Sequence, residues 1–163
     1  MREILFKAKR VDNGEWVKGY YVKAETLDGS DFEYFIIEES KDGATHKIIP
    51  ETLCQFTGLH DKHNNMIWEN DIVITQPFYD RPYSDKRKSK QFCGIVEYQT
   101  RTFNGNKFYP KQVYQAKWGL KYTEEHGKFV HFSWGDLWGC EVIGNRFDNP
   151  ELLCTPQNDE VRE

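Results

Sequence analysis

Turn-forming residues recur at short intervals along the first 43 residues of the chain: Asp12-Asn13-Gly14, Asp28-Gly29 and Asp42-Gly43. Such pairs supply the positive φ values that tight hairpin turns need. The segments between them are short and rich in aromatic and β-branched residues. These segments are Glu3–Ala8, Trp16–Lys23, Phe32–Glu38 and His46–Ile49. The spacing predicts an N-terminal meander of antiparallel strands.

Strand signals continue through the rest of the chain. The polar residues 61–65 separate two short apolar segments and predict a further hairpin, and Asn70-Asp71 predicts another turn. The later expected strands are Ile72–Thr75, Phe92–Tyr98, Phe108–Trp118, Phe129–Trp134 and Glu141–Phe147. Asn149 before Pro150 predicts a single helical turn. The chain is therefore predicted to be mainly β, with little helix.

Composition sets the size of the core and the class of protein. The 163 residues suit one domain or two small ones, and 11 Phe, 9 Tyr and 5 Trp supply a core despite a modest aliphatic content. No apolar run approaches the ~18–20 residues of a membrane span, and the N-terminus lacks the apolar stretch of a signal peptide. We therefore expect a cytoplasmic protein that does not bind membranes.

The cysteines and histidines give little indication of metal or redox chemistry. Four cysteines occur without a C-x-x-C pair and are expected to be small buried or half-buried residues: Cys54, Cys93, Cys140 and Cys154. His60 and His63 lie on a predicted turn, and no third ligand follows nearby. The sequence therefore predicts no metal site and no cofactor.

Catalytic motifs are also missing from the sequence. It contains no nucleophile elbow, no P-loop and no dinucleotide-binding motif, so no catalytic residue is assigned. Glu69 and Asp71 flank Asn70, and with a histidine they leave a metal-assisted hydrolase open as a third hypothesis. The simpler interpretation is that Asp71 orders its turn by hydrogen bonding to nearby backbone.

Residues 76–91 form the clearest break in the chain and carry its one concentrated basic patch, Lys86, Arg87, Lys88 and Lys90. With aromatic residues beside them, these side chains are candidates for contacts to a nucleic-acid backbone. The whole chain is acidic, with a formal net charge of −4, whereas nucleic-acid modules are usually basic. A solvated loop is the competing interpretation.

Five ordered segments together resemble one protein family. They are Met1–Ala8 with Gly14–Gly19, Ile49–Lys62, Ile67–Val73, Gly94–Val96 and Glu141–Leu153. In this order they are similar to the YopX family of phage and prophage proteins, and the similarity is loosest over 77–91 and 99–135. Cys54 and Asn70 stand where the family commonly has Gly. Because Asn tolerates left-handed backbone, a turn at Asn70 is still expected.

The resemblance implies a two-part, β-rich protein of phage or prophage origin inside a bacterial cell. Residues 1–65 would form the N-terminal β-rich part. Residues 66–154 would form a small barrel of the Src-homology-3 type with a long loop at 76–91, and 155–163 a flexible acidic tail. The resemblance supplies no catalytic residues.

Our functional expectation is a non-enzymatic accessory protein that binds a partner through the small barrel. Trp134 and Trp138 are the candidate partner-binding aromatics. The alternative is nucleic-acid binding through the loop Lys86–Lys90. The partner is thus an unknown protein or a nucleic acid, and pairing of exposed strand edges leaves a homo-oligomer open.

Overall fold

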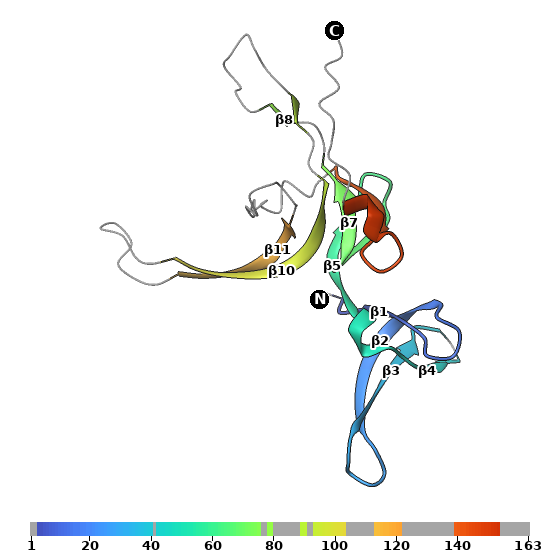
Figure 1. Cartoon of the computed structure of the whole chain (residues 1–163). Coiled ribbons are helices and arrows are strands. Elements are labelled where there is room, and N and C mark those ends of the chain that lie inside the picture. Colours follow the sequence, from blue (N-terminus) through green and yellow to red (C-terminus); the bar gives the residue numbers. More distant parts are fainter. Residues whose placement is uncertain are drawn as a thin grey trace. The chain divides into compact units, whose positions relative to one another are not determined.

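A computed structural model describes residues 3–40, 42–75, 78–79, 89–90, 93–103, 113–121 and 139–153 (Figure 1). The chain divides into two compact units. The first comprises Met1–Leu59 and Met66–Glu69, and the second comprises His60–Asn65 and Asn70–Glu163. Two 3-10 turns are the only helical elements in the described part of the chain, η1 (Pro50–Thr52) and η2 (Pro150–Leu153). No helix among these residues is long and apolar enough to cross a membrane.

The first unit is built on a six-stranded sheet with the order β4-β3-β2-β1-β5-β6. Its strands are β1 (Phe6–Lys9), β2 (Trp16–Glu25), β3 (Phe32–Glu38), β4 (Thr45–Lys47), β5 (Cys54–His60) and β6 (Met66–Trp68). Strands β1 to β4 pair consecutively and antiparallel, so the predicted N-terminal meander is confirmed. The predicted hairpin around residues 61–65 is confirmed too, since β5 and β6 are neighbours.

One face of this sheet forms the core of the first unit. Ala8, Val17, Ile36 and Ile48 are buried together. Partly buried rings cover them: the centroids of Phe6 and Tyr21 lie 5.5 Å apart. Side chains alternate between the two faces of a strand, so burial of Val17 and Tyr21 directs their neighbours in β2 to the opposite face.

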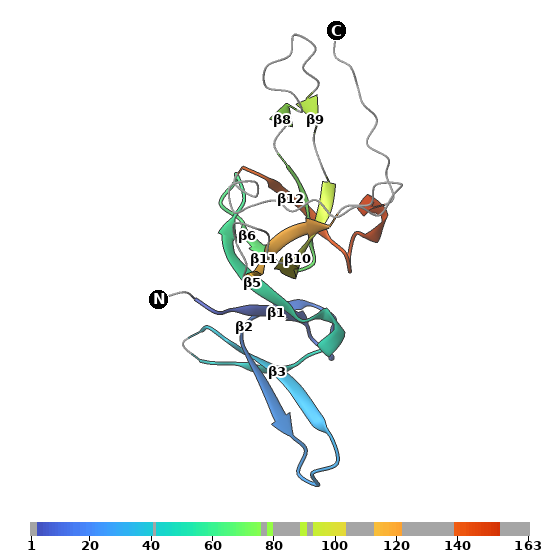
Figure 2. The same cartoon turned by 90° about the vertical axis from the view of Figure 1, so that its left-hand side faces the viewer.

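The hairpin of β2 and β3 extends beyond the rest of its sheet (Figures 1 and 2). We call residues 20–34 the arm, because residues 20–25 of β2 pair only with β3. Side-chain hydrogen bonds order its tip: the carboxylate of Asp28 accepts from the Thr26 hydroxyl at 2.7 Å and from the Ser30 hydroxyl at 2.8 Å. These bonds lower the pKa of Asp28 to about 2.

The second unit contains a four-stranded sheet with the order β11-β10-β7-β12. Its strands, all antiparallel, are β7 (Asp71–Ile74), β10 (Cys93–Phe103), β11 (Val113–Lys121) and β12 (Glu141–Asn145). A separate two-stranded sheet pairs β8 (Phe78–Tyr79) with β9 (Ser89–Lys90). Among the described residues of this unit, the buried apolar side chains are Ile72, Val73, Val96, Trp118, Leu120 and Cys140.

The expected Src-homology-3-like barrel is not confirmed. The described strands of the second unit form an open four-stranded sheet without closure. The short strands and frequent turns of the sequence agree with a small barrel, but they agree equally well with an open sheet. Strand length and turn position are local features and do not determine whether a sheet closes. Residues 108–112 of the expected strand Phe108–Trp118 and the whole expected strand Phe129–Trp134 lie outside the described residues.

Several local predictions are confirmed. Asn70 has φ 66°, the left-handed conformation expected for the turn before β7. The helical turn after Asn149 is η2. Cys54 and Cys140 are buried and Cys93 is half-buried, as expected for small apolar side chains, while Cys154 lies outside the described residues.

Candidate binding surface

The second face of the N-terminal sheet carries basic and aromatic side chains. Along β2, Val17 is buried, whereas Lys18, Tyr20 and Val22 on the other face are exposed and Trp16 is half-buried. Two further lysines come from β1, Lys7 and Lys9, and a second tryptophan, Trp68, comes from β6. We call this set the lysine–tryptophan face: Lys7, Lys9, Trp16, Lys18, Tyr20 and Trp68.

The register of β1 and β2 places two ammonium groups next to each other. Lys7 lies directly opposite Lys18, and Lys9 lies opposite Trp16. Like charges directly opposite one another destabilise a sheet. The ring of Trp68 lies beneath both ammonium groups, 5.5 Å from that of Lys7 and 5.7 Å from that of Lys18. Its π face offsets part of the repulsion.

Trp16 contacts two of the same lysines. Its ring centroid lies 5.0 Å from Lys7 Nζ and 5.6 Å from Lys9 Nζ. Lys7 is only 9% exposed, whereas Lys18 is exposed. The rings therefore hold three positive charges in one region of the sheet, and the most accessible charge is that of Lys18.

Tyr20 extends the face along β2. Its side chain is 47% exposed, and its hydroxyl donates a hydrogen bond to Glu39 Oε1 at 3.2 Å. The negative charge of Glu39 raises the pKa of the Tyr20 phenol, with a smaller contribution from Glu3. Tyr20 therefore presents a neutral ring to solvent, and the acidic groups lie at this end of the face.

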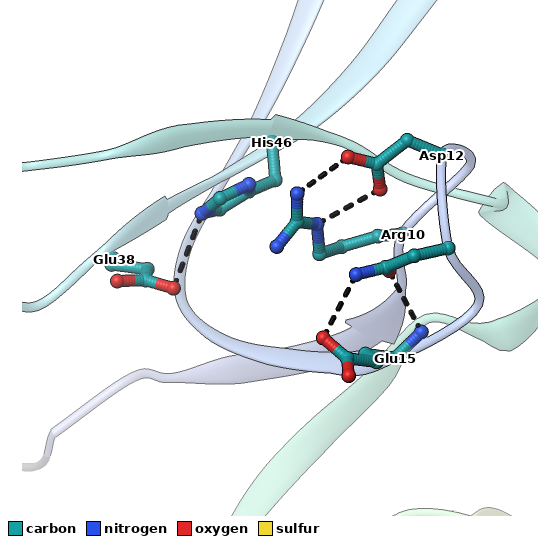
Figure 3. A network of polar contacts seen from close by, with 6 residues as sticks. Arg10, Asp12, Glu15, Glu38 and His46 are labelled. Atoms are coloured by element: carbon teal, nitrogen blue, oxygen red, sulfur yellow. Dashed lines mark hydrogen bonds and ion pairs between the residues drawn. The ribbon is translucent and has the colours of Figure 1, made fainter.

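A polar network fixes the turn between β1 and β2 (Figure 3). The guanidinium of Arg10 donates two hydrogen bonds to Asp12, and the Nε bond measures 2.9 Å. Asn13 and Glu15 bond to each other, and His46 lies 3.1 Å from Glu38 on the neighbouring strands. The bond from Arg10 lowers the pKa of Asp12. The network holds the turn from which Lys9 and Trp16 emerge.

Asp61, in the second unit, has a buried carboxylate with several hydrogen bonds, next to the histidines His60 and His63 that the sequence analysis considered. It is 6% exposed and accepts hydrogen bonds from the N–H groups of His63 and Asn65, both at 2.8 Å, and from that of Val142 at 3.2 Å. Burial raises the pKa of Asp61, but these bonds and one from the Asn65 side chain outweigh burial and lower it. This carboxylate joins the 61–65 turn to β12.

The metal-assisted hydrolase gains no support from the described residues. Among them, no group of three His, Cys, Asp or Glu side chains lies close enough together to hold a metal ion. The Nε2 of His63 lies 3.7 Å from Glu141, which also pairs with Lys62. Asp71 is buried in β7, only 2% exposed.

Comparison with known protein families identifies the chain's relatives. The family model described as "YopX protein" matches residues 5–154. The chain belongs to the YopX family. No curated protein matches this YopX-family chain. Among solved structures it is similar to the crystal structure of protein EF1440 from Enterococcus faecalis, with 22% identity, 94% of this chain and 99% of that chain covered, and a TM-score of 0.46.

The residues that the sequence singled out for binding lie largely outside the described part of this YopX-family protein. These are Lys86, Arg87, Lys88, Trp134 and Trp138. The backbone of Lys90 pairs with Phe78 in the β8–β9 sheet, but its side chain is not among those described. Their roles in partner or nucleic-acid binding stay predictions.

The lysine–tryptophan face was not predicted from the sequence, although part of its signal is present there. Lys7 and Lys9 alternate before the predicted Asp12-Asn13-Gly14 turn, and Trp16 and Lys18 alternate after it. A hairpin places such alternating residues on one face. The position of Trp68 could not be read in this way, because β6 is distant in sequence and reaches the sheet only through β5.

Proposed function

We propose that this YopX-family protein is a non-enzymatic binding module whose main contact surface is the lysine–tryptophan face. The observation that carries the proposal is that Lys18 and Tyr20 are both exposed on one face of β2, with the ring of Trp68 5.7 Å from the Lys18 ammonium group. An anionic group of a partner can pair with the exposed ammonium group of Lys18 beside the Tyr20 ring, which gives the contact electrostatic complementarity.

The biological setting is part of the same proposal. The resemblance to phage and prophage proteins supports an accessory role inside an infected or lysogenic bacterium. In that role, recognition of a cellular or phage component accounts for the aromatic and basic side chains on the sheet. Binding through residues 66–154, by a small barrel or by the loop Lys86–Lys90, is the competing route.

The experiment is affinity capture from a bacterial lysate with wild-type protein and two variants. The double variant Lys18→Gln, Tyr20→Ala removes the accessible charge and ring, and Lys23→Gln is the matched control, since Lys23 is exposed on the opposite face of β2. We expect captured material to be lost with the double variant and kept with the control. Capture of the same material by all three proteins would refute the proposal.

A further inference from the structure

We propose that the arm pairs with the arm of a second copy of this chain, edge to edge along β2, and so forms a dimer. The inference goes beyond the proposed function, because it concerns an edge of the sheet, whereas the lysine–tryptophan face lies on its surface. Three features carry it: the direction of the backbone hydrogen bonds of β2, the charges along its outer half, and the exposed side chain of Leu27.

The backbone groups of β2 alternate between its two neighbours. In an antiparallel pair, every second residue directs its N–H and C=O groups to the same neighbouring strand. The N–H of Arg10 donates to the carbonyl of Glu15 at 2.9 Å, so the odd-numbered residues of β2 face β1. The N–H of Thr26 donates to the carbonyl of Asp31 at 2.9 Å, so the even-numbered residues face β3.

The outer half of β2 therefore has an open edge. β1 stops pairing with β2 at Gly19, while the hairpin of β2 and β3 continues beyond it (Figure 2). No other strand of the described residues follows that side, so the N–H and C=O groups of Tyr21, Lys23 and Glu25 face an open edge. Such edges are often blocked by proline or by a bulge. Residues 20–25 contain no proline, and their pairing with β3 has no register shift.

The charges along this edge lack charged partners directly across their own hairpin. Lys23 and Glu25 are both exposed. Within the hairpin, Lys23 lies opposite Tyr34, and Glu25 lies opposite Phe32. The ammonium group of Lys23 lies 3.8 Å from the centroid of the Phe32 ring, so it leans along the strand toward the position of Glu25. A second strand with the opposite order of charges complements this edge.

The same strand of a second copy has that order when it runs antiparallel. With the two-fold axis at Ala24, Lys23 of each copy lies opposite Glu25 of the other, and two ion pairs form. Opposite charges directly across a sheet stabilise it, and like charges destabilise it. An axis at Lys23 places two lysines opposite each other, and an axis at Val22 brings neither charge opposite its counterpart. The charge pattern therefore selects both a second copy and one register.

This register also accounts for an exposed side chain at the tip. Leu27 is fully exposed, and Val22 is 37% exposed. Pairing centred on Ala24 brings the tip with Leu27 alongside Tyr21 of the second copy. Burial of the leucine contributes free energy to association. The pairing also joins two ribbons, each marginally stable alone, into a four-stranded sheet.

The dimer has a consequence for the surface described above. The two-fold axis of antiparallel strands in one sheet is perpendicular to that sheet. Both copies therefore present the lysine–tryptophan face on the same side of the joined sheet. A dimer can contact one extended partner at two places, which raises the effective concentration of the second contact.

The test is sedimentation velocity of the full chain over a concentration series from about 10 μM to about 1 mM. An edge contact is much smaller than a standard interface, so we expect reversible dimers with a dissociation constant of roughly 100 μM. Glu25→Lys places lysines opposite each other and is expected to weaken association at least about tenfold. Glu51→Lys changes the net charge equally at an exposed position of η1 and is expected to leave association unchanged.

An exchange of the two charges separates a lost contact from a folding defect. Lys23→Glu combined with Glu25→Lys restores the two ion pairs and is expected to return the dissociation constant to within about threefold of wild type. Thermal unfolding of each variant checks that the sheet is retained. A chain that stays monomeric throughout the series, a dimer that Glu25→Lys leaves intact, or an exchange variant that stays monomeric would each overturn the inference. The capture experiment uses protein far more dilute than this dissociation constant, so it tests the proposed function on monomers, and either proposal can fail without the other.

Discussion

Gly19 of β2 lies against the backbone of β3. A Cβ atom at this position would lie 2.0 Å from the carbonyl oxygen of Ile37 and 2.9 Å from the Cα of Glu38, both backbone atoms. Backbone atoms in a paired strand cannot move aside without breaking ladder hydrogen bonds. Glycine at this position is therefore required by the close approach of the two strands.

Replacing this glycine is expected to be much more damaging than replacing Gly14. Gly14 has φ +73° but has nothing within 4 Å of an added Cβ. We expect Gly19→Ala to lower the free energy of unfolding by about 3 kcal/mol or more, against about 1 kcal/mol for Gly14→Ala. Urea unfolding of both variants measures the difference, and equal losses would show that the close approach is relieved at little cost.

Asp61 is a second residue whose environment fixes its identity. Its carboxylate accepts from three backbone N–H groups and from the side chain of Asn65. Asp61→Ala leaves these donors without their acceptor and is expected to lower the free energy of unfolding by about 3 kcal/mol. Asp12→Ala, which removes an exposed ion pair with Arg10, is the control and is expected to cost far less. Urea unfolding that ranks the two variants equally would contradict this view.

At the scale of elements, the outer part of the arm has only two strands. Residues 20–25 of β2 pair only with β3, and β4 pairs only with residues 35–37 of β3, so residues 23–25 and 32–34 form a two-stranded ribbon. Such a ribbon is marginally stable on its own. Its tip nonetheless has an ordered set of hydrogen bonds around Asp28, while Leu27 beside it is fully exposed. Order at the tip comes from local side-chain bonds and not from burial.

Hydrogen exchange should reveal this difference along β2 and β3. We expect the backbone amides of Ala24 and Glu33 to exchange through openings of lower free energy than those of Val17 and Ile36, which lie in the core. Amide exchange followed by nuclear magnetic resonance measures both pairs in one sample. Equal protection throughout β2 would mean that the arm opens only when the whole sheet unfolds.

At the scale of the whole molecule, the carboxylates set the response to acid. The pKa values of Asp12, Asp28, Asp61 and Glu141 are all lowered in the folded chain. A lowered pKa contributes stability that is present above the unfolded value, near pH 4, and is lost as the pH falls through the folded value. The protein should therefore become less stable below about pH 4.

The prediction is checked by urea unfolding between pH 6 and pH 2.5, values chosen to bracket the unfolded carboxyl pKa of about 4. We expect the urea concentration at the midpoint of unfolding to decrease steadily as the pH is lowered beneath about 4. Asp61→Asn should flatten part of that fall, because it removes a titrating group whose folded pKa is lowered. A midpoint independent of pH would show that these carboxylates gain no net stabilisation from their partners.

The features predicted correctly from the sequence are those that depend on neighbouring residues. Turn residues such as Gly14 and Asn70, the alternation along β2 and the helical turn after Asn149 all act within a few residues, so they could be recognised without a structure. Sheet closure depends on pairing between distant strands, and the expected barrel was therefore not confirmed. The contact of Trp68 with Lys7 and Lys18 is equally distant in sequence.

The chain passes between its two units three times, after Leu59, after Asn65 and after Glu69. Neither unit is therefore encoded by one continuous stretch of the gene. A recombination event at codon 60, which replaces the preceding residues with those of a relative, separates β6 from the other strands of its sheet. One at codon 70 replaces the aspartate that bonds to Val142. The two units are consequently expected to be inherited together, and an exchange between relatives preserves both only when the incoming segment restores these contacts.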